Sequence, residues 1–503
     1  LFLTLDSIEK LRFHGFNIQC FLCGCGISLG LPSWVDCYTD MPLSEVFNLA
    51  LGKRNIQWIQ HISAGDTLRM SGYALLIKNL AIDSSAAVVF TDAIFNTSPL
   101  TEGFRGEFNP ELILSQPNRY ARSAVFNVMA LQEIGGFSTN YDLACELAAI
   151  LSIYEKYGVG GMKHYAEPII IHNIEKINVN KNRLTEQVIL HYVQRQGYSA
   201  CELKRGSDGE IHINYGHATT PNVSIMIAVG GNFELIKRCL KSVLEGTDWP
   251  NYEILLLCDL QCEKNIMQWL EAAIENLPAR LKIVRSKTGN SLAALYNEGV
   301  KSADGEFIVL LDVHAYIVQK TWLKFLLNQA IRGEVGCVGG MLINFHEESL
   351  SAGMVLGING IAAHVMAGSP LHTNDLRLKS EQRFSALSFS CIAIKKSIWL
   401  KLSGLNTRLP LLHFGETDFC LRVKELGYAL IWTPFCTMAL ENFSTSKKEN
   451  IVTDSEKKTY LKRWHKVLSN DPAYSPHFSR STASFTPEWQ LTLSGSRRQI
   501  SSQ

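Results

Sequence analysis

The segment Val223-Ser-Ile-Met-Ile-Ala-Val229 is an almost uninterrupted apolar run that follows Pro221, and it predicts a buried β-strand. A helical pattern comes next at 233–245, followed by strand patterns at 253–258 and 281–284 with a helix between them. Regular alternation of strands and helices is typical of a parallel sheet with helices on both faces. The sequence therefore predicts an α/β fold.

Polar side chains follow the predicted strands. In open parallel sheets ligands bind at the carboxyl ends of the strands. Asp312 and His314 come directly after the apolar run 307–311, and their spacing of two residues points both side chains to one side of an extended segment. They could hold a divalent cation and, through it, a diphosphate. The alternative is that they are polar caps at a strand end.

Two parts of the chain look alike. Residues 43–68 resemble residues 292–317, each with a short helix, a turn, an apolar strand and a polar strand end. Residues 134–147 likewise resemble residues 402–422. We therefore expect two copies of one domain type.

Composition narrows the functional classes. The 503 residues are 46% hydrophobic and 19% charged, which is typical of a globular protein with two to four domains. The net charge of +1 gives no electrostatic footprint for nucleic acid. No uncharged apolar stretch reaches the roughly 18 residues of a membrane span. Thirteen cysteines in apolar segments, without a secretion signal, favour the cytoplasm.

Glu416 and Asp418 lie in the segment Phe-Gly-Glu-Thr-Asp-Phe-Cys-Leu-Arg, which leads into a helix ending near Gly427. Acidic residues favour helix starts for capping and dipole reasons. The functional alternative makes one of them a general base for a hydroxyl group.

Taken together, these motifs resemble the family 2 glycosyltransferases. The resemblance rests on Val223-Ser-Ile-Met-Ile, Asn297-Glu-Gly, Leu311-Asp-x-His314 and Gly415-Glu-Thr-Asp-Phe-Cys-Leu-Arg422. Other segments are similar to tandem bacterial enzymes of O-antigen and surface polysaccharide synthesis: 351–364, Ser388-Phe-Ser-Cys391, Asp471-Pro-Ala-Tyr-Ser-Pro476, Phe90-Thr-Asp92 and Ile134-Gly-Gly-Phe137.

The resemblance implies two GT-A domains in tandem, a Rossmann-like fold of nucleotide-diphospho-sugar transferases. We expect the first to be N-terminally incomplete, because the chain begins at Leu1 in what reads as the end of a helix. The expected organisation is a degenerate, non-catalytic domain at 1–175, a connector at 176–220, a catalytic domain at 221–476 and a Ser-rich mobile tail at 477–503.

The family's metal-binding positions are altered in this chain. Asp312 matches the residue that contacts ribose or metal, His314 stands where the family has its metal-binding aspartate, and Glu441 stands where the family usually has histidine. The exchanged set Asp312, His314 and Glu441 would bind a divalent cation, Mn²⁺ or Mg²⁺, and imidazole favours Mn²⁺. The alternative is independent decay of an unused site.

The resemblance also implies roles for other residues. Glu416 takes the place of the catalytic aspartate, Asp418 orients the acceptor or caps the helix, and Arg422 is a structural ion-pair partner. The donor site would contain Asp259, Asn290, Asn297 and Asp312, although Asn297 could instead satisfy backbone groups.

Alignment of the copies at Asn48 and Asn297 leaves the first copy without these groups. Ser63 and Gly65 replace Asp312 and His314, and Asn140, which cannot accept a proton at neutral pH, replaces Glu416. We therefore expect the first copy not to transfer sugar, but to hold acceptor or brace the second copy.

The predicted protein is an inverting, hexosyltransferase-type glycosyltransferase of bacterial surface polysaccharide synthesis. It would use a nucleotide-sugar donor and a glycan, lipid-linked oligosaccharide or protein acceptor, in the cytoplasm or at the inner face of the plasma membrane. The alternative is a catalytically dead scaffold that binds sugar or nucleotide. A zinc site at Cys20-x-x-Cys23-x-Cys25 is disfavoured, because the run fits a buried strand better.

Overall fold

The computed structural model describes residues 1–24, 30–173, 178–230, 232–260, 262–276, 280–286, 291–371, 375–441, 453–490 and 498–499. The chain divides into two compact units. The first unit contains residues 1–203, 474–478 and 487–503, and the second contains 204–473 and 479–486. No helix in the described ranges is long and apolar enough to cross a lipid bilayer.

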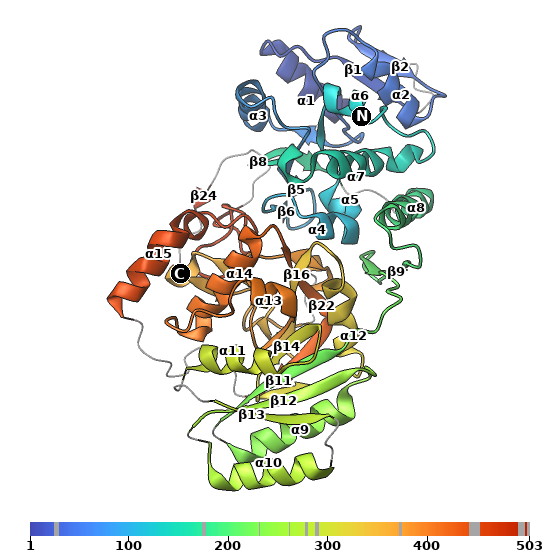
Figure 1. Ribbon diagram of the computed structural model, residues 1–503. Coiled ribbons are helices and arrows are strands. Elements are labelled where there is room, and N and C mark those ends of the chain that lie inside the picture. Colours follow the sequence, from blue (N-terminus) through green and yellow to red (C-terminus); the bar gives the residue numbers. More distant parts are fainter. Residues whose placement is uncertain are drawn as a thin grey trace. The chain divides into compact units, whose positions relative to one another are not determined.

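The second unit is built on the parallel strands that the sequence predicts (Figure 1). Their order in the sheet is β13-β12-β11-β14, and all three neighbouring pairs are parallel. The strands are β11 (Val223–Val229), β12 (Tyr252–Cys258), β13 (Leu281–Arg285) and β14 (Phe307–Leu311). The helices between them are α9 (Phe233–Gly246), α10 (Lys264–Asn276) and α11 (Leu292–Ser302).

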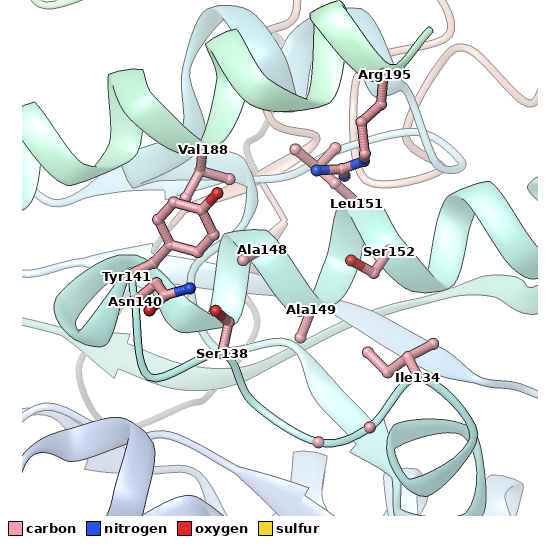
Figure 2. A pocket seen from close by; sticks show the side chains of 12 residues that line it. Ile134, Ser138, Asn140, Tyr141, Ala148, Ala149, Leu151, Ser152, Val188 and Arg195 are labelled. Carbon is pink, nitrogen blue, oxygen red and sulfur yellow. The ribbon is translucent and has the colours of Figure 1, made fainter.

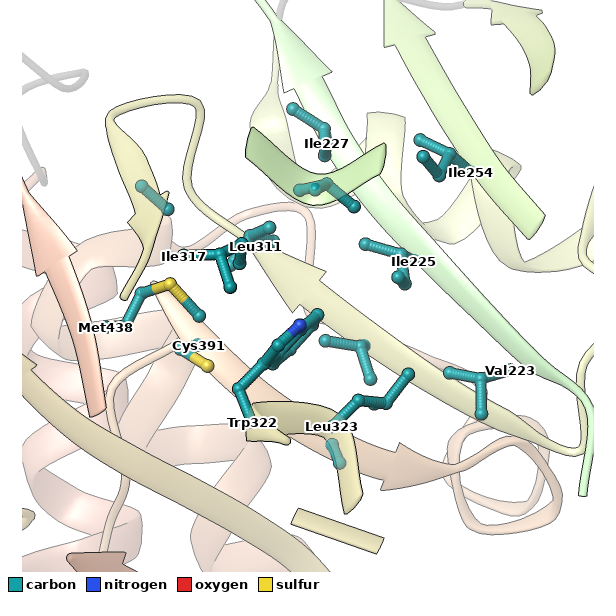
Figure 3. Close-up of a cluster of buried hydrophobic side chains, with 14 of the residues drawn as sticks. Val223, Ile225, Ile227, Ile254, Leu311, Ile317, Trp322, Leu323, Cys391 and Met438 are labelled. Carbon is teal, nitrogen blue, oxygen red and sulfur yellow. The ribbon is translucent and has the colours of Figure 1, made fainter. Parts of the chain in front are cut away.

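Alternate residues of β11 face opposite helix layers. Val223, Ile225 and Ile227 lie in one buried cluster with Trp322 of α12 (Trp322–Ala330), as Figure 3 shows. On the other face, Gly299 of α11 approaches the sheet so closely that an added Cβ would lie 2.8 Å from Leu257. Helices therefore cover both faces, as expected for an α/β sheet of this kind.

The same sheet continues past β14 with strands of mixed direction, in the order β14-β21-β16-β22-β15. Successive pairs are antiparallel, antiparallel, parallel and antiparallel, and β17 adds to β16. The strands are β15 (Ala315–Ile317), β16 (Val335–Ile343), β17 (Ser349–Ser351), β21 (Cys391–Lys395) and β22 (Ala429–Leu440). Smaller strands are β18 (Met354–Leu356), β19 (Ala362–His364) and β20 (Gln382–Arg383), and the later helices are α13 (Lys396–Lys401), α14 (Glu416–Glu425) and α15 (Asp454–Ser469).

The sheet of the first unit repeats this mixed half. Its order is β3-β7-β5-β8-β4, the successive pairs have the same four directions, and β6 adds to β5. The strands are β3 (Trp58–Gln60), β4 (Thr67–Leu68), β5 (Val88–Phe95), β6 (Thr101–Gly103), β7 (Val125–Asn127) and β8 (Met162–His172). The repeat inferred from the sequence is therefore present in the strand order and direction of both sheets.

The remaining elements of the first unit flank this sheet. Its helices are α1 (Phe2–Phe13), α2 (Leu43–Leu51), α3 (Met70–Ile82), α4 (Pro110–Ser115), α5 (Pro117–Tyr120), α6 (Val128–Glu133), α7 (Cys145–Tyr157) and α8 (Val179–Arg195). Two parallel strands, β1 (Cys20–Cys23) and β2 (Val35–Tyr38), form a small separate sheet. The cysteine run is thus a strand, half-buried instead of fully buried, and Cys25 lies outside the described residues.

The boundaries of the units differ from the predicted ones. The first unit extends to residue 203, past the expected limit of 175, and it includes α8. The chain passes from the first unit to the second within β9 (Glu202–Arg205), which pairs with β10 (Ile211–Asn214) in a two-stranded sheet. Within the segment expected to be a mobile tail, Phe478 and Phe485 are buried. Two short strands, β23 (Trp489–Gln490) and β24 (Arg498–Gln499), follow them.

Candidate functional site

Asp312 and His314 lie together at the carboxyl end of β14. The Nδ1 atom of His314 is 2.7 Å from Oδ1 of Asp312, and the backbone N–H of His314 donates to the same oxygen at 2.9 Å. Their side chains are 21% and 18% exposed, respectively. The two groups lie together, but not on the extended segment that the sequence predicted: the backbone N–H of Ala315 donates to the carbonyl of Asp312 at 2.9 Å, so the two side chains are joined across a turn.

Glu416 begins α14 and is buried, with 2% of its surface exposed. Its Oε1 atom accepts a hydrogen bond from the backbone N–H of Phe389 at 2.9 Å. This donor belongs to the segment before β21 and not to α14, so the carboxylate is held by another element. The contact fixes the side chain in one orientation.

The carboxylates of Glu416 and Asp312 are bound by two neighbouring residues, Phe389 and Ser390. Ser390 follows Phe389, and its carbonyl accepts the backbone N–H of Asp312 at 2.9 Å. The hydroxyl of Ser390 also donates to Oδ2 of Asp312 at 3.4 Å. Sequence reasoning noted the Ser-Phe-Ser-Cys motif but gave Ser390 no role. The structure shows that this motif joins the Asp312 side of the site to Glu416.

Asp418 is held by two protein side chains. Its Oδ2 accepts from Nε of Arg422 at 2.8 Å, and its Oδ1 accepts from the indole N–H of Trp464 at 3.2 Å. The guanidinium of Arg422 also donates to the carbonyls of Leu402 and Gly404, both at 3.0 Å. The structural role expected for Arg422 is therefore confirmed. The same contacts favour a structural role for Asp418, which fastens α14 to α15.

The predicted donor residues separate into three cases. Asp259 follows β12 and is half-buried at the same sheet edge as Asp312, because β12, β11 and β14 are parallel. The side-chain amide of Asn297 instead donates to the carbonyl of Leu405 at 2.9 Å and accepts its N–H at 2.8 Å. Asn297 therefore satisfies the backbone groups of Leu405, which was the alternative to a place in the donor site. Asn290 lies outside the described residues.

Glu441 lies beside the Asp312–His314 pair but is bound elsewhere. Its backbone N–H donates to the carbonyl of His314 at 3.2 Å, whereas its carboxylate pairs with Arg238 of α9. Across the described ranges, no group of three or more His, Cys, Asp and Glu side chains is arranged to hold a metal ion. As arranged, Asp312, His314 and Glu441 thus do not fit the predicted three-ligand set.

The sequence offered no local signal for Arg238. Arg238 and Glu441 are 35% and 36% exposed, so they form a partly exposed ion pair that neither side chain requires. The arginine could not be selected from the sequence, since about 200 residues separate the two positions.

In the first unit, the sheet register identifies the counterparts of His314 and Glu441. Ala315 pairs with Leu440 in the second unit, and Thr67 pairs with Ile171 in the first. The residues just outside these pairs are therefore equivalent: Asp66 corresponds to His314, and His172 corresponds to Glu441.

This register corrects the ungapped alignment, which placed Gly65 on His314. Nine residues separate Trp58 from Thr67, whereas eight separate their counterparts Phe307 and Ala315. The first unit therefore has one extra residue before β4. The extra residue brings Asp66 into the ladder position of His314.

Asp66 and His172 form a closed, buried cluster. Oδ2 of Asp66 is 2.9 Å from Nδ1 of His172, and Nη2 of Arg122 lies 3.0 Å from both carboxylate oxygens. Burial acts to raise the pKa of Asp66, but His172 and Arg122 outweigh it and hold that pKa below its ordinary value. Burial also lowers the pKa of His172. The internal arginine supplies the compensating positive charge.

The counterpart of Glu416 in the first unit also differs from the one predicted. Gly158 and Gly427 follow α7 and α14, and both have positive φ, 62° and 85°. Eleven residues separate Glu416 from Gly427, and eleven separate Leu147 from Gly158. Leu147 therefore corresponds to Glu416, and Asn140 lies seven residues earlier. The position has no carboxylate in either alignment.

Residues 224–389 match the family model described as glycosyl transferase family 2. The second unit carries a family 2 glycosyltransferase domain. This match runs from Ser224 in β11 to Phe389 and confirms the family resemblance inferred from the sequence.

Relatives of known sequence match beyond this family 2 domain. The chain is 24% identical over 486 residues to an uncharacterized protein, y4gI, of Sinorhizobium fredii, covering 90% of this chain and 52% of that protein. It is 23% identical over 444 residues to the O-antigen biosynthesis protein RfbC of Myxococcus xanthus, covering 84% of this chain and 34% of the relative. The chain thus spans about half and about a third of their lengths.

Among solved structures, the crystal structure of GalNAc-T7 with UDP, GalNAc and Mn²⁺ has a TM-score of 0.43 at 16% identity. The match covers 54% of this chain and 52% of that one.

Proposed function

We propose that the chain is an inverting glycosyltransferase that moves a sugar from a nucleotide-sugar donor to an acceptor hydroxyl in bacterial surface polysaccharide synthesis. The family 2 match and the relative named for O-antigen biosynthesis support this proposal. The observation that carries it is the junction at Phe389 and Ser390, which joins buried Glu416 to Asp312. The acceptor would be a glycan, a lipid-linked oligosaccharide or a protein.

In this proposal Glu416 is the general base. Its carboxylate accepts the proton of the acceptor hydroxyl, and the acceptor oxygen forms a bond to the anomeric carbon. The bond from that carbon to the diphosphate oxygen breaks on the opposite face, and the nucleotide diphosphate departs. One displacement of this kind inverts the configuration. The hydrogen bond from Phe389 orients the carboxylate for the transfer.

On the donor side we place Asp259 and Asp312, at the carboxyl ends of β12 and β14. A divalent cation bound there would offset the charge of the departing diphosphate. The carboxylate of Glu441 pairs with Arg238, so the described residues do not form a three-ligand set for this cation. The proton transfer and displacement assigned to Glu416 do not depend on the cation.

We further propose that the two units are GT-A domains in tandem, the first one incomplete and non-catalytic. The support is the strand order β3-β7-β5-β8-β4, which has the directions of β14-β21-β16-β22-β15. Leu147 in place of Glu416 removes the base. Asp66, which stands at the position of His314, forms a buried ion pair with Arg122.

The test compares Glu416→Gln with Glu425→Gln, a control on the same helix whose carboxylate forms an exposed pair with Arg463. Nucleotide release from UDP- and GDP-sugars is measured with a polysaccharide extract as acceptor. E416Q is expected to lose at least about 100-fold in rate while retaining nucleotide binding, and E425Q is expected to stay near wild type.

Full transfer by E416Q would contradict the assigned base. Nucleotide binding by the wild type without turnover of any donor would instead favour the scaffold alternative.

A further inference from the structure

The first unit contains a pocket of about 410 Å³ between residues 134–141, α7 and α8 (Figure 2). Its volume falls within the range of about 300–1,000 Å³ typical of small-molecule sites. Nothing in the proposed transfer reaction uses it, since the reacting groups belong to the second unit.

The pocket exists because α7 carries small side chains where α14 carries larger ones. Counted back from Gly158 and Gly427, the residues Ala148, Ala149 and Ser152 correspond to Thr417, Asp418 and Leu421. In the second unit two of these larger residues contact the covering helix α15, because Thr417 is hydrogen-bonded to Tyr460 and Asp418 accepts a hydrogen bond from Trp464. In the first unit, the corresponding volume is open and lined by α8.

The lining is rich in neutral hydrogen-bonding groups. Figure 2 shows Ser138, Asn140, Tyr141 and Ser152 around the opening, with Ala148 and Ala149 on its α7 side. Hydroxyl groups both donate and accept, and the asparagine amide does the same through separate atoms. The hydroxyl of Tyr141 is 2.7 Å from Nδ1 of His191, which fixes the position of its ring.

The charge at the pocket is balanced. Arg195 is the one charged side chain among the twelve lining residues, and it forms two hydrogen bonds with Glu155, from Nε at 3.2 Å and from Nη2 at 3.0 Å. Glu155 thus balances the guanidinium charge that would otherwise favour a phosphate or carboxylate ligand. The chemistry therefore matches a neutral polyol with one apolar face.

We propose that this pocket binds a single neutral sugar residue of a glycan. The sugar hydroxyls would exchange hydrogen bonds with Ser138, Asn140 and Ser152. Its C–H face would pack on the Tyr141 ring and the two alanines. The first unit would then be a glycan-binding module, a role independent of catalysis.

The test is saturation-transfer NMR and titration of the full chain with methyl glycosides of glucose, galactose, mannose and N-acetylglucosamine, without nucleotide. We expect saturable binding of at least one glycoside. Ser152→Phe fills the pocket, and Asn140→Ala removes one amide from an exposed position of the lining. Each substitution should weaken binding by about tenfold or more.

Gln194→Ala is the matched control, because this exposed amide lies on α8 outside the lining. It should bind like wild type. Absence of binding by every glycoside would overturn the proposal. Unchanged binding by N140A and a folded S152F would also overturn it, as would displacement of the sugar by inorganic phosphate.

Discussion

Asn297 and Leu405 are joined by two hydrogen bonds, from the side-chain amide to the carbonyl at 2.9 Å and from the backbone N–H to Oδ1 at 2.8 Å. Asn48 and Phe137 make the same two bonds in the first unit, at 2.8 and 2.9 Å. In both units an asparagine of the short helix thus anchors the chain that leads toward α7 or α14. The relationship explains the repeated asparagine without any ligand.

Asn297→Ala should therefore lower stability more than it lowers donor binding. Loss of both bonds leaves the N–H and carbonyl of Leu405 without this partner, and we expect a loss of about 2 kcal/mol in the free energy of unfolding. Denaturant titration measures the change. Asn406→Ala, at an exposed position nearby, should change it by no more than about 0.5 kcal/mol. Unchanged stability with lost nucleotide binding would restore Asn297 to the donor site.

Gly404→Ala tests the same anchor from the opposite side. Gly404 has φ of 75°, and an added Cβ would lie 2.1 Å from Oδ1 of Asn297. Both the backbone strain and the overlap should destabilise the second unit, by about 2–4 kcal/mol. Gly427→Ala is the control, because Gly427 also has positive φ but its added Cβ meets no atom within 4 Å. Equal losses in the two variants would show that the overlap with Asn297 is relieved.

Asp418→Asn should behave as a stability variant. Asp418 and Arg422 are 5% and 12% exposed, and removal of one charge leaves the other poorly compensated, at a cost of about 3 kcal/mol. A double-mutant cycle with Trp464→Phe should give a coupling energy of about 1 kcal/mol. Glu425→Gln, in an exposed ion pair on the same helix, should cost less than about 1 kcal/mol. A stable D418N without transfer activity would instead support a catalytic Asp418.

Local patterns predicted much of this arrangement. Apolar runs identified β11 and β14, because a strand buried on both faces has little polar alternation. The polar residues Asp312 and Asp259, which follow β14 and β12, lie at one edge because the parallel direction of neighbouring strands requires it. The sequence repeat predicted a structural repeat, although not where it begins in each sheet.

Which residues of the two copies correspond could be identified only from the tertiary structure. One extra residue before β4 moves Asp66 into the place first given to Gly65, and strand pairing alone reveals the insertion. Leu147 and not Asn140 corresponds to Glu416, because both lie eleven residues before the positive-φ glycine that follows the helix. Likewise, the Arg238–Glu441 pair joins distant segments and has no local signature.

Arg238→Met tests whether Glu441 can serve as a cation ligand. The variant keeps an unbranched side chain but removes the guanidinium that pairs with Glu441. If Asp312, His314 and Glu441 form a cation site on release, Mn²⁺ should bind up to about fivefold more tightly, because a partly exposed ion pair is worth at most about 1 kcal/mol. Electron paramagnetic resonance of free Mn²⁺ measures the affinity. Lys237→Met, beside it on α9, should leave it unchanged, and equal affinity of R238M and wild type would contradict the three-ligand hypothesis.

Acid should destabilise the first unit through His172. Burial lowers the pKa of His172 below its ordinary value of 6.5, so the unfolded chain takes up this proton first, and stability is lost as pH falls through 6.5. Asp66, with its pKa held below 3.8, adds a further loss only in stronger acid. His172→Gln should therefore be less stable than wild type at pH 7.5 but lose less between pH 7.5 and about 5.5. Denaturant titrations at the two pH values measure the difference.

His212→Gln in the second unit is the comparison, because burial lowers the pKa of His212 to about 4. A slope in H172Q as steep as that of the wild type would show that the acid sensitivity arises elsewhere.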